Sequence, residues 1–223
     1  MNKFIGLAVC VALAGVSKGA AAQFGGMPKL PGLGGGESSA PAGDIDGYLA
    51  RSTETAKLMM SAVAILDYAK TPNGDKAALK AKLTAISSKK DTKELNAYKA
   101  EIEPQTKALN DDANAVAAIQ ANYAKASAQE KALISAAVLN MLIAVPRAVK
   151  LAKDGPELLK GLGSNPANLG KIGKIKGAVE LFASQVGSTA KFAGALPSLA
   201  KTVKVVVPAN PQTATVTAYN DIY

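Results

Sequence analysis

Apolar residues recur along most of this chain at spacings of three, four and seven, which place them on one face of a helix. The pattern predicts helices over residues 44–70, 75–88, 91–104 and 169–204, with a further helical region over 105–153. Alternation typical of a strand is confined to the end of the chain. We therefore expect an all-α fold, a helical bundle of about five to seven helices.

Several residues indicate where these helices begin and end. Ser127 and Glu130 form a capping box, so either two helices meet there or one long helix carries the signal in its interior; we favour two helices. Pro146 is expected to kink or end its helix, because proline lacks the amide hydrogen of the helical ladder. Gly155 and Pro156 are typical of a helix end followed by a new helix start.

One segment, residues 132–145, is almost wholly apolar and is interrupted only by Ser135 and Asn140. A membrane-spanning helix needs about 20 apolar residues. Because the segment has only about 14, we expect no transmembrane span in the mature chain. An apolar helix of this length is typical of the centre of a bundle. The alternative is a segment that enters a membrane after the bundle opens.

Five apolar residues form a candidate hydrophobic face shared by this segment and the last predicted helix. The sequence leaves open whether the face is packed as core or encloses a hydrophobic ligand. The five residues are Leu139, Leu142, Ile143, Phe182 and Val186.

Both ends of the chain differ from its helical part. Residues 1–22 have a basic start, an apolar run and small residues at the end, which predict a secretory signal peptide cleaved near Ala22-Gln23. Residues 23–43 are rich in Gly and Pro and predict a flexible leader. Residues 205–223 are expected to form an extended tail rather than part of a sheet. The helical bundle is thus expected over residues 44–204.

The signal peptide predicts a periplasmic or extracellular protein, and its removal changes the composition. The one cysteine, Cys10, lies within it, and loss of Lys3 and Lys18 lowers the net charge from +9 to +7. Nearly all of the remaining positive charge is lysine, without the arginine and aromatic residues that nucleic-acid binding favours. We expect no nucleic-acid partner, and either a solvated lysine surface or attraction to an anionic surface or lipid.

The residue types left in the mature chain argue against catalysis. Without cysteine or histidine it lacks the usual zinc and copper ligands and the usual general base, so no metal or cofactor is expected. Asp111 and Asp112 are adjacent on a helix, so their side chains diverge by about 100°. Ser-x-x-Lys occurs at Ser87, Ser188 and Ser198 without the partner motifs of penicillin-recognising enzymes. We expect a protein that is not an enzyme.

Two kinds of non-enzymatic function fit these features. The first is a structural or adaptor module that binds another protein of the cell envelope. The second is a carrier of lipid or another hydrophobic ligand, or a peripheral protein of a membrane surface. The apolar segment 132–145 suits the second function, but it suits any plain bundle equally well, and the adaptor is therefore favoured.

Overall fold

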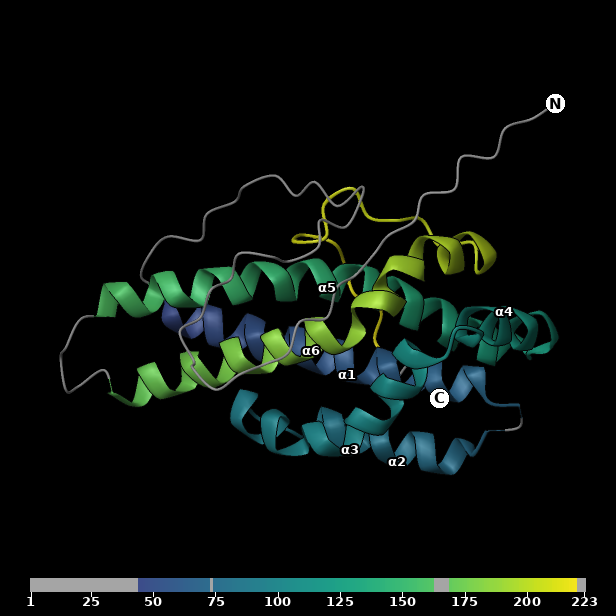
Figure 1. The fold of residues 1–223 in the computed structure, drawn as a ribbon, viewed down its shortest axis with the longest axis horizontal. Coiled ribbons are helices and arrows are strands. Elements are labelled where there is room, and N and C mark those ends of the chain that lie inside the picture. Colours follow the sequence, from purple (N-terminus) through teal and green to yellow (C-terminus); the bar gives the residue numbers. More distant parts are fainter. Residues whose placement is uncertain (1–43, 73, 163–168, 220–223) are drawn as a thin grey trace. The chain divides into compact units, whose positions relative to one another are not determined.

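The computed structural model describes residues 44–72, 74–162 and 169–219. These residues form six helices, together with the segments that join and follow them (Figure 1). They contain no strand, so the predicted all-α bundle is confirmed. The predicted signal peptide (1–22) and leader (23–43) lie outside the described residues. The helices are α1 (Ile45–Lys70), α2 (Lys76–Ser87), α3 (Thr92–Asp111), α4 (Ala115–Lys125), α5 (Ala128–Leu162) and α6 (Leu169–Thr202).

The four longest helices form the body of the bundle. α1 packs against α3 and α5, and α6 packs against the same two helices. α1 and α6 also touch each other, while the short helices α2 and α4 pack mainly on α1. The apolar faces of all four long helices therefore meet in one core, whose large, fully buried side chains include Tyr48, Met59, Ile65, Leu95, Met141, Ile143, Ile175 and Phe182.

Aspartates begin the first three helices, as the sequence pattern indicates. The Asp44 carboxylate accepts a hydrogen bond from the Gly47 amide at 2.8 Å. Asp75 and Asp91 cap α2 and α3 in the same way. Each carboxylate satisfies amide groups that have no partner inside the helix and lies at the positive end of the helix dipole.

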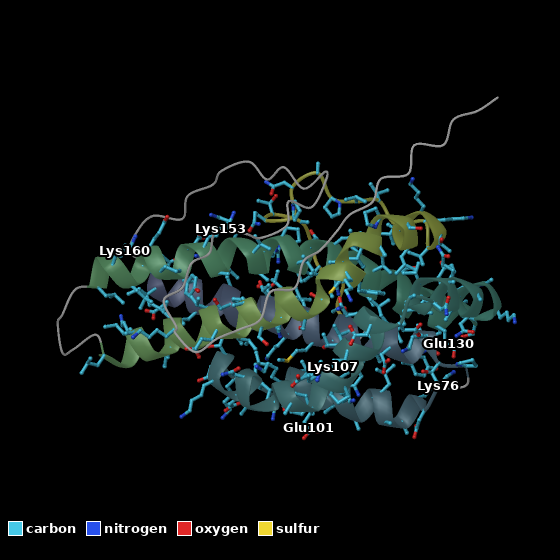
Figure 2. All side chains as sticks on the ribbon, in the orientation of Figure 1. Lys76, Glu101, Lys107, Glu130, Lys153 and Lys160 are labelled. Atoms are coloured by element: carbon cyan, nitrogen blue, oxygen red, sulfur yellow. The ribbon has the colours of Figure 1, made fainter. Side chains whose placement is uncertain are left out.

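The capping box predicted at Ser127 is confirmed, and it separates α4 from α5. The Glu130 amide donates to Ser127 Oγ at 3.3 Å, and the Glu130 carboxylate accepts from the Ser127 amide at 3.0 Å. Glu130 also binds Lys76 of α2 at 2.9 Å (Figure 2) and accepts from the Tyr68 hydroxyl of α1 at 3.2 Å. The hydrogen bonds from Lys76 and from Ser127 lower the pKa of Glu130 to about 2.

The prediction that a helix ends near Pro104 is wrong, because α3 continues through that residue. The chain breaks later, at a turn in which Asp112 Oδ1 accepts from the Asn114 amide at 2.8 Å. Packing explains the continuation, since buried residues follow one another on a single helix face across the proline. These residues are Ile102, Thr106 and Leu109.

The predicted helix end at Gly155 and start at Pro156 are also wrong. α5 runs without interruption through Pro146, Gly155 and Pro156. Gly155 is buried where three helices meet: a Cβ atom there would lie 2.7 Å from the Tyr48 hydroxyl of α1 and even closer to Val179 Cγ2 of α6. This glycine therefore allows close packing of helices rather than marking a helix end.

The apolar segment 132–145 is by itself too short to span a membrane, but it belongs to the much longer helix α5. With 35 residues, α5 is long and apolar enough to cross a membrane by length and composition. In the bundle, 67 % of its most apolar window of 18 residues is buried. Such burial is typical of a core helix, which is the environment predicted for residues 132–145.

Candidate functional site

The chain after α6 forms an extended segment that passes over α5 (Figure 1). α6 ends in a Schellman turn, in which Lys204 has a φ of 57° and the Val205 amide donates to the Ala200 carbonyl at 2.9 Å. We call residues 205–219 the tail segment. The tail segment forms neither helix nor strand and turns at residues 211–213, and the last four residues of the predicted tail, 220–223, lie outside the described residues.

Asn140 of α5 binds both main-chain groups of one residue in the tail segment. Its Nδ2 donates to the Thr217 carbonyl at 2.8 Å, and its Oδ1 accepts from the Thr217 amide at 2.9 Å. These are the two kinds of bond that a neighbouring β-strand makes in a sheet. Asn140, one of the two polar residues that interrupt the apolar segment, is fully buried, and both of its polar atoms are satisfied by a residue 77 positions away.

Arg147 lies two helical turns further along α5, on the same face as Asn140. Its Nε donates to the Pro211 carbonyl at 2.8 Å, and its Nη2 donates to the carbonyls of Gln212 at 3.3 Å and Ala214 at 2.8 Å. Nη1 lies 3.6 Å from Glu54 Oε1 of α1. The planar guanidinium presents donors on several edges at once, so one side chain holds a whole turn of the tail.

We call Asn140 and Arg147 the α5 strip, because both side chains bind the tail through its main chain. Every polypeptide carries the same main-chain groups, so the strip can hold an extended segment of another sequence. Two side-chain groups of the tail are also buried: the ring of Pro211 and the hydroxyl of Tyr219. Burial raises the pKa of the Tyr219 hydroxyl, and the nearby Asn140 side chain offsets part of this rise.

The five residues predicted as a ligand or core face lie partly in the core. Ile143 and Phe182 are fully buried and Leu142 nearly so, whereas Leu139 and Val186 are half-buried. Two hollows border the described helices, a crevice of about 50 Å³ between α1, α3 and α6 and an open groove of about 450 Å³ beside α1. None of the five residues lines either of them.

The open groove has mixed charge. Lys57, Lys90 and Lys174 line it together with Glu54 and Asp91. Because carboxylates stand among the lysines, their fields partly cancel and the groove is not a dedicated site for an anion. The predicted attraction to anionic surfaces gains no local support from it.

The sequence contains the residues of the α5 strip but no signal that joins them to the tail. Asn140 stands out as a polar interruption, and Arg147 as one of only two arginines beyond residue 22, the other being Arg51. Neither pattern indicates a partner in residues 205–219. The strip became recognisable only through the path of the chain after α6.

No group of three acidic, histidine or cysteine side chains gathers as a metal site in the part of the chain that the structure describes. The chain matches no family model, no curated protein and no solved structure.

Proposed function

We propose that this protein is an exported, non-enzymatic binding module of the cell envelope, and that its α5 strip binds extended polypeptide. The observation that carries the proposal is the pairing of Asn140 with the main chain of Thr217. A buried amide lowers stability unless both of its polar atoms find partners. The centre of the apolar helix α5 therefore requires a ligand of this kind, and the tail segment supplies it.

The contacts of Arg147 support the same proposal and define the ligand further. Arg147 donates to three carbonyls of the tail, at Pro211, Gln212 and Ala214, so the ligand is an extended chain with one turn. At the first of these positions Arg147 uses the carbonyl and not the amide, so the ligand can have a proline there. The partner we expect is an extended, proline-tolerant segment of another envelope protein, since residues 1–22 predict export.

The tail segment is the resident ligand in this proposal. A short flexible tether keeps such a segment at an effective concentration in the millimolar range. A partner segment must therefore bind the strip more tightly than the tail does, or be present above this effective concentration, to replace the tail. The module would hold its partner while its own tail is released, and would protect its strip from solvent when no partner is present.

The alternative of a hydrophobic-ligand carrier or membrane-surface protein rests on the length and apolarity of α5. It requires α5 to separate from α1 and α6, because Ile143 and Phe182 are fully buried. Flotation of the mature protein with liposomes of anionic and neutral lipids tests it directly. Recovery of the protein with the liposomes, or of lipid with the purified protein, would favour the carrier.

The experiment for the binding module uses a fluorescent peptide with the sequence of residues 205–219 and the full mature chain. Thr217→Pro removes the amide that Asn140 accepts from, so it loosens the resident tail, and we expect it to bind the peptide at least tenfold more tightly than the wild type. Adding Asn140→Ala should abolish this gain. The matched control is Thr215→Pro, because Thr215 is exposed and its amide makes no hydrogen bond within the described part of the chain. Equal peptide binding by all variants would refute the proposal.

A further inference from the structure

A crevice between α1, α3 and α6 contains a buried amide without a partner. The Gln185 side chain of α6 lines this crevice, and the residue is 8 % exposed. Neither its Nε2 nor its Oε1 has a hydrogen-bond partner among the described residues. An unpaired buried amide lowers stability, and such departures from good packing are expected chiefly at functional sites.

The mouth of the crevice is polar and is lined by one ammonium group and one carboxylate, those of Lys99 and Glu103. Lys99 Nζ donates to Ser184 Oγ at 3.2 Å, and both residues line the crevice. Glu103 lines it as well, but its carboxylate already lies 3.4 Å from the Lys107 ammonium, one helical turn further along α3. Lys107 does not line the crevice but offsets the charge of Glu103, so the Lys99 ammonium is the cation that the crevice presents.

The inner wall supplies few other hydrogen-bond donors. The Thr106 hydroxyl donates to the Ile102 carbonyl at 3.0 Å, and the Thr189 hydroxyl donates to the Gln185 carbonyl at 2.7 Å. Both hydroxyl protons are thereby used within their own helices. The remaining donors are Gln185 Nε2, the Lys99 ammonium and the Ser184 hydroxyl, above a floor of Met59, Met60 and Val63.

We propose that this crevice binds a small carboxylate that carries a hydrogen-bond donor beside its carboxylate group, such as glycolate or glycine. The Lys99 ammonium and Gln185 Nε2 would donate to the carboxylate, and Gln185 Oε1 would accept from the neighbouring hydroxyl or ammonium. A volume of about 50 Å³ is far below the several hundred Å³ of a drug-sized pocket, so the ligand has only a few non-hydrogen atoms. The crevice shares no residue with the α5 strip, so the two proposals fail independently.

The test is a titration of the mature protein with glycine, glycolate, acetate and ethylamine, followed by NMR chemical shifts. We expect glycine and glycolate to bind with dissociation constants of the order of millimolar, acetate several-fold more weakly, and ethylamine not at all. Gln185→Leu and Lys99→Met should each weaken glycolate binding at least tenfold. Lys93→Met, an exposed lysine on the same helix as Lys99, should leave it unchanged.

Any one of three results would overturn the proposal. The first is the absence of saturable binding by any of the carboxylates up to about 50 mM, which means that water alone fills the crevice. The second is unchanged glycolate binding by Gln185→Leu. The variant remains informative because its amide has no protein partner: its thermal midpoint should equal or exceed that of the wild type. A lower midpoint would show that the amide is paired within the protein and would also refute the proposal.

Discussion

The side chain of Asn140 and the main chain of Thr217 are joined by two hydrogen bonds that run in opposite directions, at 2.8 and 2.9 Å. A residue in the middle of a helix thus does for an extended segment what a neighbouring strand does in a sheet. Gln185 of α6 is the contrasting case, a buried amide without any partner among the described residues. Replacement by an apolar side chain should therefore lower the stability of the fold at Asn140, and should leave it unchanged or raise it at Gln185.

Replacing Asn140 tests the contribution of the strip to stability. Asn140→Ala removes two hydrogen bonds, each worth about 1 kcal/mol, so we expect the free energy of unfolding to fall by about 2 kcal/mol. The Thr217 amide should also lose its protection from hydrogen exchange. Urea denaturation and exchange measured by NMR check both effects. Asn96→Ala on α3 is the control, and a loss as large as that of Asn140→Ala, or unchanged exchange at Thr217, would contradict the account.

Two glycines of α5 form a matched pair. Gly155→Ala places a methyl group against Tyr48 and Val179, so we expect a loss of about 1–3 kcal/mol in unfolding free energy. Gly161 lies in the same helix, and a Cβ atom added there meets no atom within 4 Å. Gly161→Ala should therefore raise the free energy of unfolding by about 0.5–1 kcal/mol through helix propensity. Thermal unfolding of both variants gives the comparison. A loss of equal size at both positions would show that the close approach of three helices at Gly155 is not the cause.

The lowered pKa of Glu130 makes the stability of the fold depend on pH. Its folded-state pKa of about 2 lies below the ordinary value of 4.5, so its contribution is complete above about pH 4.5 and is lost as the pH falls towards 2. Because Lys76 is well exposed, we expect Glu130→Gln to lose only about 1 kcal/mol at pH 7. The loss comes from the missing negative charge, since a glutamine side chain can still accept the hydrogen bond of the Ser127 amide. The difference from the wild type should shrink below pH 4.5. Glu101→Gln on the exposed face of α3 is the control (Figure 2), and a difference that stays constant with pH would contradict the assignment.

Export makes a prediction about the N-terminus of the mature protein. The small residues that end at Ala22 should be followed by cleavage, so the exported protein should begin at Gln23. N-terminal sequencing of protein from the cell envelope or the culture medium checks this. Intact protein that keeps residues 1–22 and remains in the cytoplasm would contradict the predicted compartment and, with it, the class of partner.

Local signals predicted the helix starts well and the helix ends poorly. Asp44, Asp75, Asp91 and Ser127 act through neighbours three residues away, so the sequence contains the whole interaction. The effect of Gly155 instead depends on Tyr48 and Val179, which come from two other helices. Prolines inside α3 and α5 were misleading for the same reason, because tertiary packing outweighs the lost amide hydrogen bond.

The candidate site shows the same division. Hydrophobic spacing predicted a shared apolar face for Phe182, Ile143 and Leu142, which are buried in the structure, but it did not distinguish a packed core from a ligand site. The partner of Asn140 was not predictable, because a helix pattern carries no information about an extended segment 77 residues away. A polar residue inside an otherwise apolar helix is nevertheless a usable signal that a specific partner exists.

The central claim is that the α5 strip recognises main chain rather than side chains, and modified peptides test it most directly. The Thr217→Pro protein is titrated with tail peptides that carry either an N-methyl group on the amide of Thr217 or alanine in place of its side chain. We predict that N-methylation weakens binding at least tenfold, because Asn140 Oδ1 loses its donor, and that the alanine peptide binds within threefold of the parent. Strong loss with the alanine peptide and none with the N-methylated peptide would contradict the account.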